Sequence, residues 1–268
     1  MVEEYRNFSY KTIGDLDPDR TLIVLPLGAL EQHGPQAPLG TDGMIAEEMV
    51  KLIKEKLLLL DKDGRLAGNV LTMPVIPVGY SVEHLNFPGS ISLKPETYYH
   101  MLYDIVESLS LHGFKNVAFL ICHGGNRAIC EVVSRQIRHD TGSRLYLISS
   151  GSFSDEMVKK TISKGNENDF HGGEMETSMV MAIDENLTDL KESRRGHYKY
   201  KSDNGSLNFS GPLALPWLAD DFVDDDGKPL GIGGDPSGAS GAKGKIILDV
   251  SARDCALGIA EILEKMES

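Results

Sequence analysis

The chain has 268 residues, enough for one large α/β domain or two small ones, and nothing in its composition requires a division, so we expect one domain over residues 1–268. Because 27 Lys and Arg face 40 Asp and Glu, the net charge of −13 disfavours nucleic acid and anionic membrane surfaces as partners. No apolar run approaches the length of a membrane span and residues 1–6 lack the pattern of a signal peptide, so a cytoplasmic protein is expected.

The first third of the chain begins with a strand pattern followed by a helix pattern. Residues 21–27 are continuously apolar, as in a parallel strand that is covered on both faces. Apolar residues then recur every three or four positions from residue 41 or 42 to about residue 60, which predicts an amphipathic helix. Residues 70–78 predict a second strand, in which Pro74 and Pro77 indicate a sheet edge or an early exit.

The middle of the chain continues this alternation. A loop is predicted over residues 79–90, a helix from residue 95 to about 112, a strand at 117–121, a helix at about 128–139 and a strand at 144–149. Strands that alternate with helices predict an α/β fold with a mostly parallel central sheet and helices on both faces.

The last third is less regular. A helix opens within residues 171–178 and continues to about residue 183. The Gly-, Ser-, Asp- and Pro-rich residues 202–244 predict a long ordered loop, in which Trp217 would pack against the body or a neighbouring subunit. A final helix is expected from about Ser251, with Asp254 in a capping position.

Candidate metal ligands follow the first strand. In an extended segment residues i and i+2 point to the same side, so Glu31 and His33 would face one space while Gln32 faces away. The flanking Gly and Pro residues let the chain turn back and bring Asp42 toward the pair. Two carboxylates and an imidazole aimed at one point form a donor set for a divalent metal ion.

A second histidine loop follows the third predicted strand. His123 stands directly after residues 117–121 and before a helix, as Glu31 and His33 stand after the first strand. Ligands of open α/β sheets bind outside the carboxyl ends of the strands, so these loops are expected to share one crevice. Backbone N–H groups at Gly124 and Gly125 could approach a substrate oxygen or an anion there.

Two further acids open the helix after His171. Glu174 and Glu176 differ by about 200° around a helix, so at most one of them would face the site. Acids in a first turn are also favoured by the helix dipole, which is the structural alternative for either residue.

These motifs together resemble the creatininase family of metal-dependent amidohydrolases over nearly the whole chain. The resemblance rests on Leu27 to Gly34, Thr41-Asp42, Glu83-His84-x-x-Phe87-Pro88-Gly89, His123-Gly124-Gly125-Asn126, His171-Gly172-Gly173-x-x-Glu176-Thr177-Ser178 and Gly234-Asp235-Pro236. It implies a single-domain α/β/α sandwich with a central, mostly parallel sheet, two divalent metal ions per subunit (Zn, Mn or Fe(II)) and a homo-oligomer, often a hexamer.

The resemblance also implies a ligand set. Glu31, Asp42 and His123 would hold one ion, and His33 with Asp42 the other, so that Asp42 bridges the two. Creatininase itself has a further carboxylate two residues after the third-strand histidine, where this chain has Gly125. Glu176 is the expected replacement, with Glu174 as the alternative.

The implied reaction is hydrolysis of the C–N bond of a small-molecule cyclic amide or formamide by a hydroxide that bridges the two metal ions. His171 matches the family's substrate-side histidine and would protonate the leaving nitrogen, with His84 or Glu176 as the alternative acid. Creatinine is not expected as the substrate, because Asp169 and Phe170 stand beside His171 where creatininase has an enclosing tryptophan.

Other functions remain open at this point. A hydrolase or isomerase that acts on an oxidised cyclitol or sugar could use the same centre, and so could a non-catalytic metal-binding protein. A metal content near zero after purification would instead favour a structural subunit. Neither the substrate nor the native metal follows from the sequence, because mixed carboxylate and imidazole ligands suit several divalent ions.

Overall fold

The computed structural model of the chain describes residues 1–151, 156–166, 169–200, 207–209 and 213–266. The strands are β1 (Val2–Glu4), β2 (Thr21–Leu27), β3 (Asn69–Thr72), β4 (Asn116–Ile121), β5 (Arg144–Ser149), β6 (His197–Tyr198) and β7 (Phe222–Val223). The helices are α1 (Tyr10–Gly14), α2 (Thr41–Lys62), α3 (Pro95–Leu111), α4 (Asn126–Thr141), α5 (Glu156–Thr161), α6 (Glu174–Ile183) and α7 (Gly241–Met266).

The central sheet has the strand order β1-β3-β2-β4-β5, and every neighbouring pair is parallel. The chain moves from β2 to β3 on one side and later to β4 on the other side of β2, so the strand order reverses between β2 and β4. In open α/β sheets this reversal leaves a crevice outside the carboxyl ends of the two strands. Leu27, Ile121 and Ser149 lie in register, so β2, β4 and β5 end at the same level.

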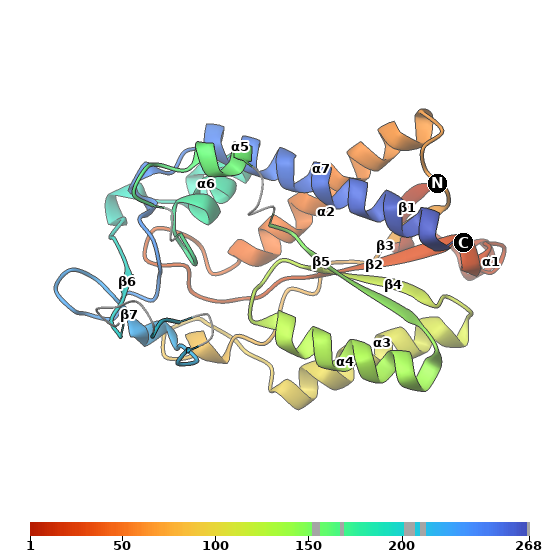
Figure 1. Cartoon of the computed structure of the whole chain (residues 1–268), viewed down its shortest axis with the longest axis horizontal. Coiled ribbons are helices and arrows are strands. Elements are labelled where there is room, and N and C mark those ends of the chain that lie inside the picture. Colours follow the sequence, from red (N-terminus) through yellow and green to blue (C-terminus); the bar gives the residue numbers. More distant parts are fainter. Residues whose placement is uncertain (152–155, 167–168, 201–206, 210–212, 267–268) are drawn as a thin grey trace.

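Helices cover both faces of this sheet (Figure 1). One face packs against α3 and α4 through an apolar core that includes Ile23, Phe119, Tyr98 and Val133. The other face packs against α2 and α7, with α6 beside them, through a core that includes Leu22, Met49 and Ile247. The predicted α/β sandwich with a mostly parallel sheet is therefore confirmed.

The second strand is shorter than expected and is not at an edge. β3 ends at Thr72, before Pro74 and Pro77, and it lies between β1 and β2. Proline lacks the N–H that a ladder hydrogen bond requires, so the early exit was predicted correctly. The edge position was wrong because β1, three residues near the start of the chain, was too short to predict from its pattern.

The prediction for the last helix was also wrong at its start. α7 begins at Gly241, so Ser251 and Asp254 lie inside the helix rather than at its cap. A Cβ atom at Gly244 would overlap the carbonyl oxygen of Ser178 in α6. The glycines that suggested a loop instead permit the close approach of two helices, a tertiary requirement that is invisible in local composition.

The region between α6 and α7 lies at the end of the molecule where β2 and β4 finish, opposite the termini (Figure 1). It contains the antiparallel pair β6 and β7. Of the expected loop at residues 202–244, residues 202–206 and 210–212 lie outside the described part.

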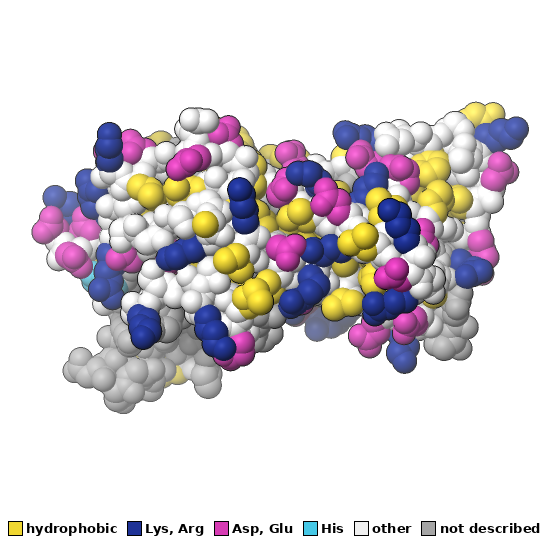
Figure 2. All heavy atoms as spheres, turned by 90° about the horizontal axis from the view of Figure 1, so that it is seen from above, with side chains coloured by type: hydrophobic (Ala, Val, Ile, Leu, Met, Phe, Trp, Pro, Cys, Tyr) yellow, Lys and Arg dark blue, Asp and Glu magenta, His cyan; other side chains and the backbone are white. Residues whose placement is uncertain are grey.

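The face that carries α5 and α7 shows basic and acidic side chains interspersed, with single apolar residues between them (Figure 2). None of the helices in the described part of the chain combines the length and the hydropathy that a membrane span needs.

Candidate metal centre

The loops after β2 and β4 meet outside the sheet, as expected. Within the described residues, three groups of side chains have ligand atoms within 4.8 Å of one another. The groups are Glu31, His33 and Asp42; His33, His171 and Glu176; and Glu31, His84 and His171. These groups share members, and His123 joins them through its contact with Glu31. All the predicted site residues therefore lie in one cluster, and all of them except Glu176 are buried.

Asp42, at the start of α2, lies between two histidines. Its Oδ1 atom is 3.6 Å from Nε2 of His33, and its Oδ2 atom is 3.6 Å from Nδ1 of His123. Gly28 lets the loop pass close to this helix end, because a Cβ atom there would lie 3.0 Å from the Cα atom of Gly43. The two oxygens of one carboxylate therefore face two different imidazoles.

Glu31 is fully buried and lies 3.2 Å from Nδ1 of His123 through its Oε1 atom. Among the described residues, neither of its carboxylate oxygens has a hydrogen-bond partner, and the same holds for Nε2 of His33 and Oδ2 of Asp42. Buried polar atoms are almost always paired, and leaving one without a partner costs about 1–3 kcal/mol or more. This group of orphaned donor atoms therefore fits divalent metal ions.

The hydrogen bonds of His33 and His123 leave the right nitrogens free for a metal. Nδ1 of His33 lies 3.1 Å from the carbonyl oxygen of Glu31, and Nε2 of His123 lies 3.0 Å from the carbonyl oxygen of Tyr80. A carbonyl only accepts, so each of these nitrogens carries the proton and donates it. In the neutral ring, the opposite nitrogen offers its lone pair to the cluster, the usual arrangement for a metal-binding histidine.

Gln32 holds the other two histidines, although it was expected to face away. Its side-chain amide orientation is fixed, because Oε1 accepts from the N–H of Gly34 and Nε2 donates to the carbonyl of Gly231. The same Nε2 lies 2.9 Å from Nδ1 of His84, which must therefore accept, so the ring proton of His84 is on Nε2. The backbone carbonyl of Gln32 accepts from Nε2 of His171, which frees Nδ1 of that ring.

His84 thus differs from the other three histidines. Its Nε2–H group lies 3.3 Å from Oε1 of Glu31 without forming a hydrogen bond to it, whereas His171 presents an unprotonated Nδ1 at 3.7 Å from the same oxygen. His84 can donate a proton or a hydrogen bond in this tautomer but cannot bind a metal ion through Nε2. The alternation of Glu31, Gln32 and His33 had placed Gln32 on the opposite side, and its partners lie at distant positions of the chain, so the sequence carried no signal for this role.

The side chains of Glu176 and Glu174 point in different directions from α6. Oε2 of Glu176 lies 3.6 Å from Nε2 of His33 and accepts from the N–H of Gly172. The carboxylate of Glu174 instead accepts from Asn166, from the backbone and side chain of Ser163, and from Lys243. Glu176 therefore joins the cluster, and Glu174 belongs to a separate buried network.

The space into which a side chain at position 125 would extend is occupied by other groups. A Cβ atom there would overlap Nε2 of His123 and the carboxylate of Glu83, and would come within 2.7 Å of the carbonyl of Tyr80. Glu83 lies 3.7 Å from Nε2 of His123, on the ring edge that faces away from Glu31. The chain thus has no room at position 125 for the carboxylate of creatininase, and Glu83 supports the back of His123.

The cluster shifts the pKa values of its histidines in opposite directions. Burial alone would lower the pKa of His33 and His123, but the carboxylates of Asp42 and Glu176, and of Glu31 and Asp42, raise them to about 10. Burial and the neighbouring His33 lower the pKa of His171 to about 4. Burial and the surrounding histidines also lower the pKa of His84, so His84 and His171 are neutral at pH 7.

An aromatic wall borders the cluster. Trp217 was expected to pack on the body or a neighbour, and its ring lies 5.5 Å from His84 and 5.2 Å from Phe170. These residues line an open cleft of about 660 Å³, the outer cleft, together with Glu83, His123 and Glu176. An aromatic side chain far along the sequence therefore reaches the site, which neither spacing nor composition could show.

Comparison with known proteins gives this cluster a context. The family model described as creatinine amidohydrolase matches residues 6–257. The mycofactocin precursor peptide peptidase of Mycobacterium ulcerans is 30% identical over 243 residues, which cover 89% of this chain and 84% of that protein.

Solved creatininases share the fold. A mutant creatininase in its Zn–Zn form superposes with a TM-score of 0.73 at 22% identity, covering 97% of both chains. A manganese form of creatininase superposes with a TM-score of 0.72 at 22% identity, covering 97% of this chain and 98% of that one. The family match over nearly the whole chain and the shared fold show that the chain belongs to the creatininase family of metal-dependent hydrolases.

Proposed function

We propose that the chain is a binuclear metal-dependent amidohydrolase that cleaves a C–N bond of a small molecule. The observation that carries this proposal is the position of Asp42, whose two oxygens face His33 and His123 separately at 3.6 Å. One ion would be held by Glu31, Asp42 and His123, and the other by His33, Asp42 and Glu176. Mixed carboxylate and imidazole ligands suit Zn, Mn or Fe(II).

When bound, two adjacent divalent ions supply an activated water and polarise a carbonyl oxygen, the two requirements for attack on a stable amide. The residues of this chain would hold and orient the ions. The backbone carbonyls of Glu31 and Tyr80 fix the rings of His33 and His123, and Glu83 supports His123 from behind.

His171 is the proposed proton carrier. Its Nε2–H is anchored on the carbonyl of Gln32, so its free Nδ1 faces Glu31 at 3.7 Å and Glu176 at 4.0 Å. A neutral imidazole in this position can accept a proton at Nδ1 and pass it to the leaving nitrogen. His84 presents an N–H group to the same space and would supply a hydrogen bond to the substrate or stabilise Glu31.

A peptide bond is the second candidate for the cleaved amide. It is supported by the mycofactocin precursor peptide peptidase, which is similar over 89% of this chain. The outer cleft, at about 660 Å³, is large enough to admit a chain segment as well as a small molecule. Oligomerisation, with a hexamer as the expected state, remains a prediction.

The test is to remove the metal with a chelator, reconstitute the protein with Zn, Mn or Fe(II), and assay release of a primary amine. Formamides, cyclic amides and short peptides form the substrate panel, and elemental analysis gives the metal content. Two ions per chain with metal-dependent amine release would support the proposal. Fewer than two ions, or no amine from any substrate at full loading, would contradict it.

A further inference from the structure

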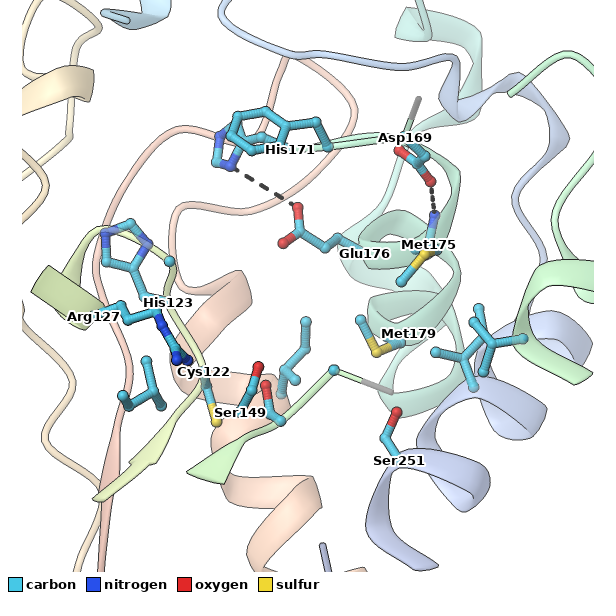
Figure 3. Close-up of a pocket in the computed structure, with 18 residues that line it drawn as sticks. Cys122, His123, Arg127, Ser149, Asp169, His171, Met175, Glu176, Met179 and Ser251 are labelled. Carbon is cyan, nitrogen blue, oxygen red and sulfur yellow. Dashed lines mark hydrogen bonds and ion pairs between the residues drawn. The ribbon is translucent and has the colours of Figure 1, made fainter. Parts of the chain in front are cut away.

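A second cavity, the inner pocket, adjoins the proposed metal ligands (Figure 3). It has a volume of about 390 Å³ and is lined by His123, His171 and Glu176 on the side of the cluster. Figure 3 shows Cys122 and Ser149, at the ends of β4 and β5, near Met179 of α6 and Ser251 of α7. The cavity therefore lies between the sheet edge and the helical layer and opens onto the site.

The wall of the inner pocket away from the cluster is mainly apolar. Its aliphatic and methionine side chains come from five elements and are Ile45, Ile121, Val158, Met175, Met179 and Ile247. Its only cationic side chain among the described residues is Arg127, which is 54% exposed and pairs with Glu131 at 3.1 Å. The cavity thus offers burial to an apolar group, and its described residues present no unpaired cation to an anion.

The outer cleft has the same charge character. Its lining includes the carboxylates of Asp42, Glu83 and Glu176 beside Trp217, and among its described residues there is neither a lysine nor an arginine. His123, His171 and Glu176 line both cavities. Apart from the proposed metal ions, the described walls of both cavities hold no unpaired cation for a phosphate group, and their carboxylates at short range raise the free energy of binding an additional anion.

We infer that the substrate is an amide that has no phosphate group and that places an apolar substituent, about the size of a leucine side chain, in the inner pocket. This inference rests on the proposed hydrolysis of an amide. The remainder of the substrate lies in the outer cleft against Trp217. Each buried CH₂ group of the substituent increases kcat/KM by about fourfold, provided that it stays in contact with the cavity wall.

The first test compares matched amides on metal-loaded protein. N-formyl-leucinamide and N-formyl-glycinamide differ only in an apolar group on the nitrogen side, and isocaproamide and acetamide differ likewise on the acyl side. We expect kcat/KM to rise at least tenfold for the apolar member of one pair, and N-formyl-O-phosphoserinamide to be no better than the glycinamide. Equal rates within both pairs, or a preference for the phosphorylated amide, would overturn the inference.

The second test changes the cavity. Met179→Ala enlarges the inner pocket and Ser251→Leu narrows it, so the preference for the larger apolar group should increase in the first variant and fall at least tenfold in the second. Met101→Ala is the matched control, because it removes the same atoms from α3, which packs on the other face of the sheet. An unchanged preference in both pocket variants would place the substituent elsewhere.

A binding measurement separates this inference from the proposed function. Ligand-observed NMR on metal-free protein compares N-acetyl-leucinamide with N-acetyl-glycinamide, in the wild type and in Ser251→Leu. Preferential binding that is lost in Ser251→Leu supports the apolar pocket even if no amide is hydrolysed, in which case only the proposed reaction fails. Hydrolysis without any preference, in rate or in binding, contradicts the inference alone.

Discussion

Glu31 and Glu174 are both fully buried carboxylates, yet their surroundings differ completely. Glu174 accepts hydrogen bonds from Asn166 and Ser163, in the segment before α6, and pairs with Lys243 of α7. Neither oxygen of Glu31 has a hydrogen-bond partner among the described residues. A buried charge that the chain satisfies stabilises the fold, whereas one left unsatisfied is poised for a bound group.

The largest expected effect comes from removing the proposed bridge. Asp42→Asn keeps the shape of the side chain but removes the charge that two ions would share, so both ions should be lost and kcat/KM should fall more than about 100-fold. Elemental analysis and amine release measure the two effects. Unchanged metal stoichiometry in this variant would show that Asp42 is not a shared ligand.

Variants of Glu176 and Glu174, both on α6, test the difference between the metal cluster and the buried network of Glu174. Glu176→Gln should loosen one ion by roughly 10–100-fold and lower hydrolysis accordingly, with little change in stability. Glu174→Gln should leave metal affinity within a small factor but reduce the free energy of unfolding by about 3 kcal/mol, because it breaks a largely buried ion pair. Denaturant unfolding and metal titration of both variants measure this, and the reverse pattern would exchange their roles.

Glu31→Gln tests whether the carboxylate of Glu31 contributes to metal binding rather than to stability. In the metal-free protein it should lower the free energy of unfolding by less than Glu174→Gln does, because the carboxylate has no hydrogen-bond partner and its loss removes only one of the charges that raise the pKa of His123. Metal affinity should nevertheless fall at least tenfold. A loss of stability as large as that of Glu174→Gln would mean that the two carboxylates have the same structural role.

Metal binding should release protons. The pKa values of His33 and His123 are raised to about 10 by the neighbouring carboxylates, so both rings are protonated in metal-free protein at pH 8. A ligand must be deprotonated, so each ion displaces about one proton and the apparent affinity rises about tenfold per pH unit up to about pH 10. Calorimetry in two buffers of different ionisation enthalpy measures the release, and an uptake of protons would contradict it.

The smallest effect is expected at Gln32, which supplies partners to two rings of the centre. Gln32→Met has a similar length but cannot donate to His84 or to the carbonyl of Gly231, so kcat/KM should fall by about tenfold while the metal content is kept. His84 would then be free to change its tautomer. A loss of metal from this variant would show that the ring supports the ions directly.

The sequence predicted the strands at 21–27 and 144–149 correctly because their apolar patterns are long and local. It failed at Gly241 to Gly244, where the contact with Ser178 determines the residue type, and at β1, which is defined only by its pairing with β3. Tertiary contacts decide both cases, and local propensity does not contain them.

For the site, the residue types and their placement after β2 and β4 predicted that most members of the cluster lie close together. Three features required coordinates: the amide of Gln32 between two rings, the filling of the space beside Gly125 by Glu83, and the approach of Trp217. Each of these contacts joins segments that are distant in the sequence, so spacing carried no signal for it.

The contact between Gly244 and Ser178 also has a consequence for the order of events during synthesis. Every proposed metal ligand, from Glu31 to Glu176, leaves the ribosome before α7 does. Until then α2 covers that face of the sheet without its neighbour α7, and α6 lacks the helix against which it packs. Metal loading is thus expected to follow the docking of α7, and a chain arrested before residue 241 should carry the complete ligand set without holding the ions.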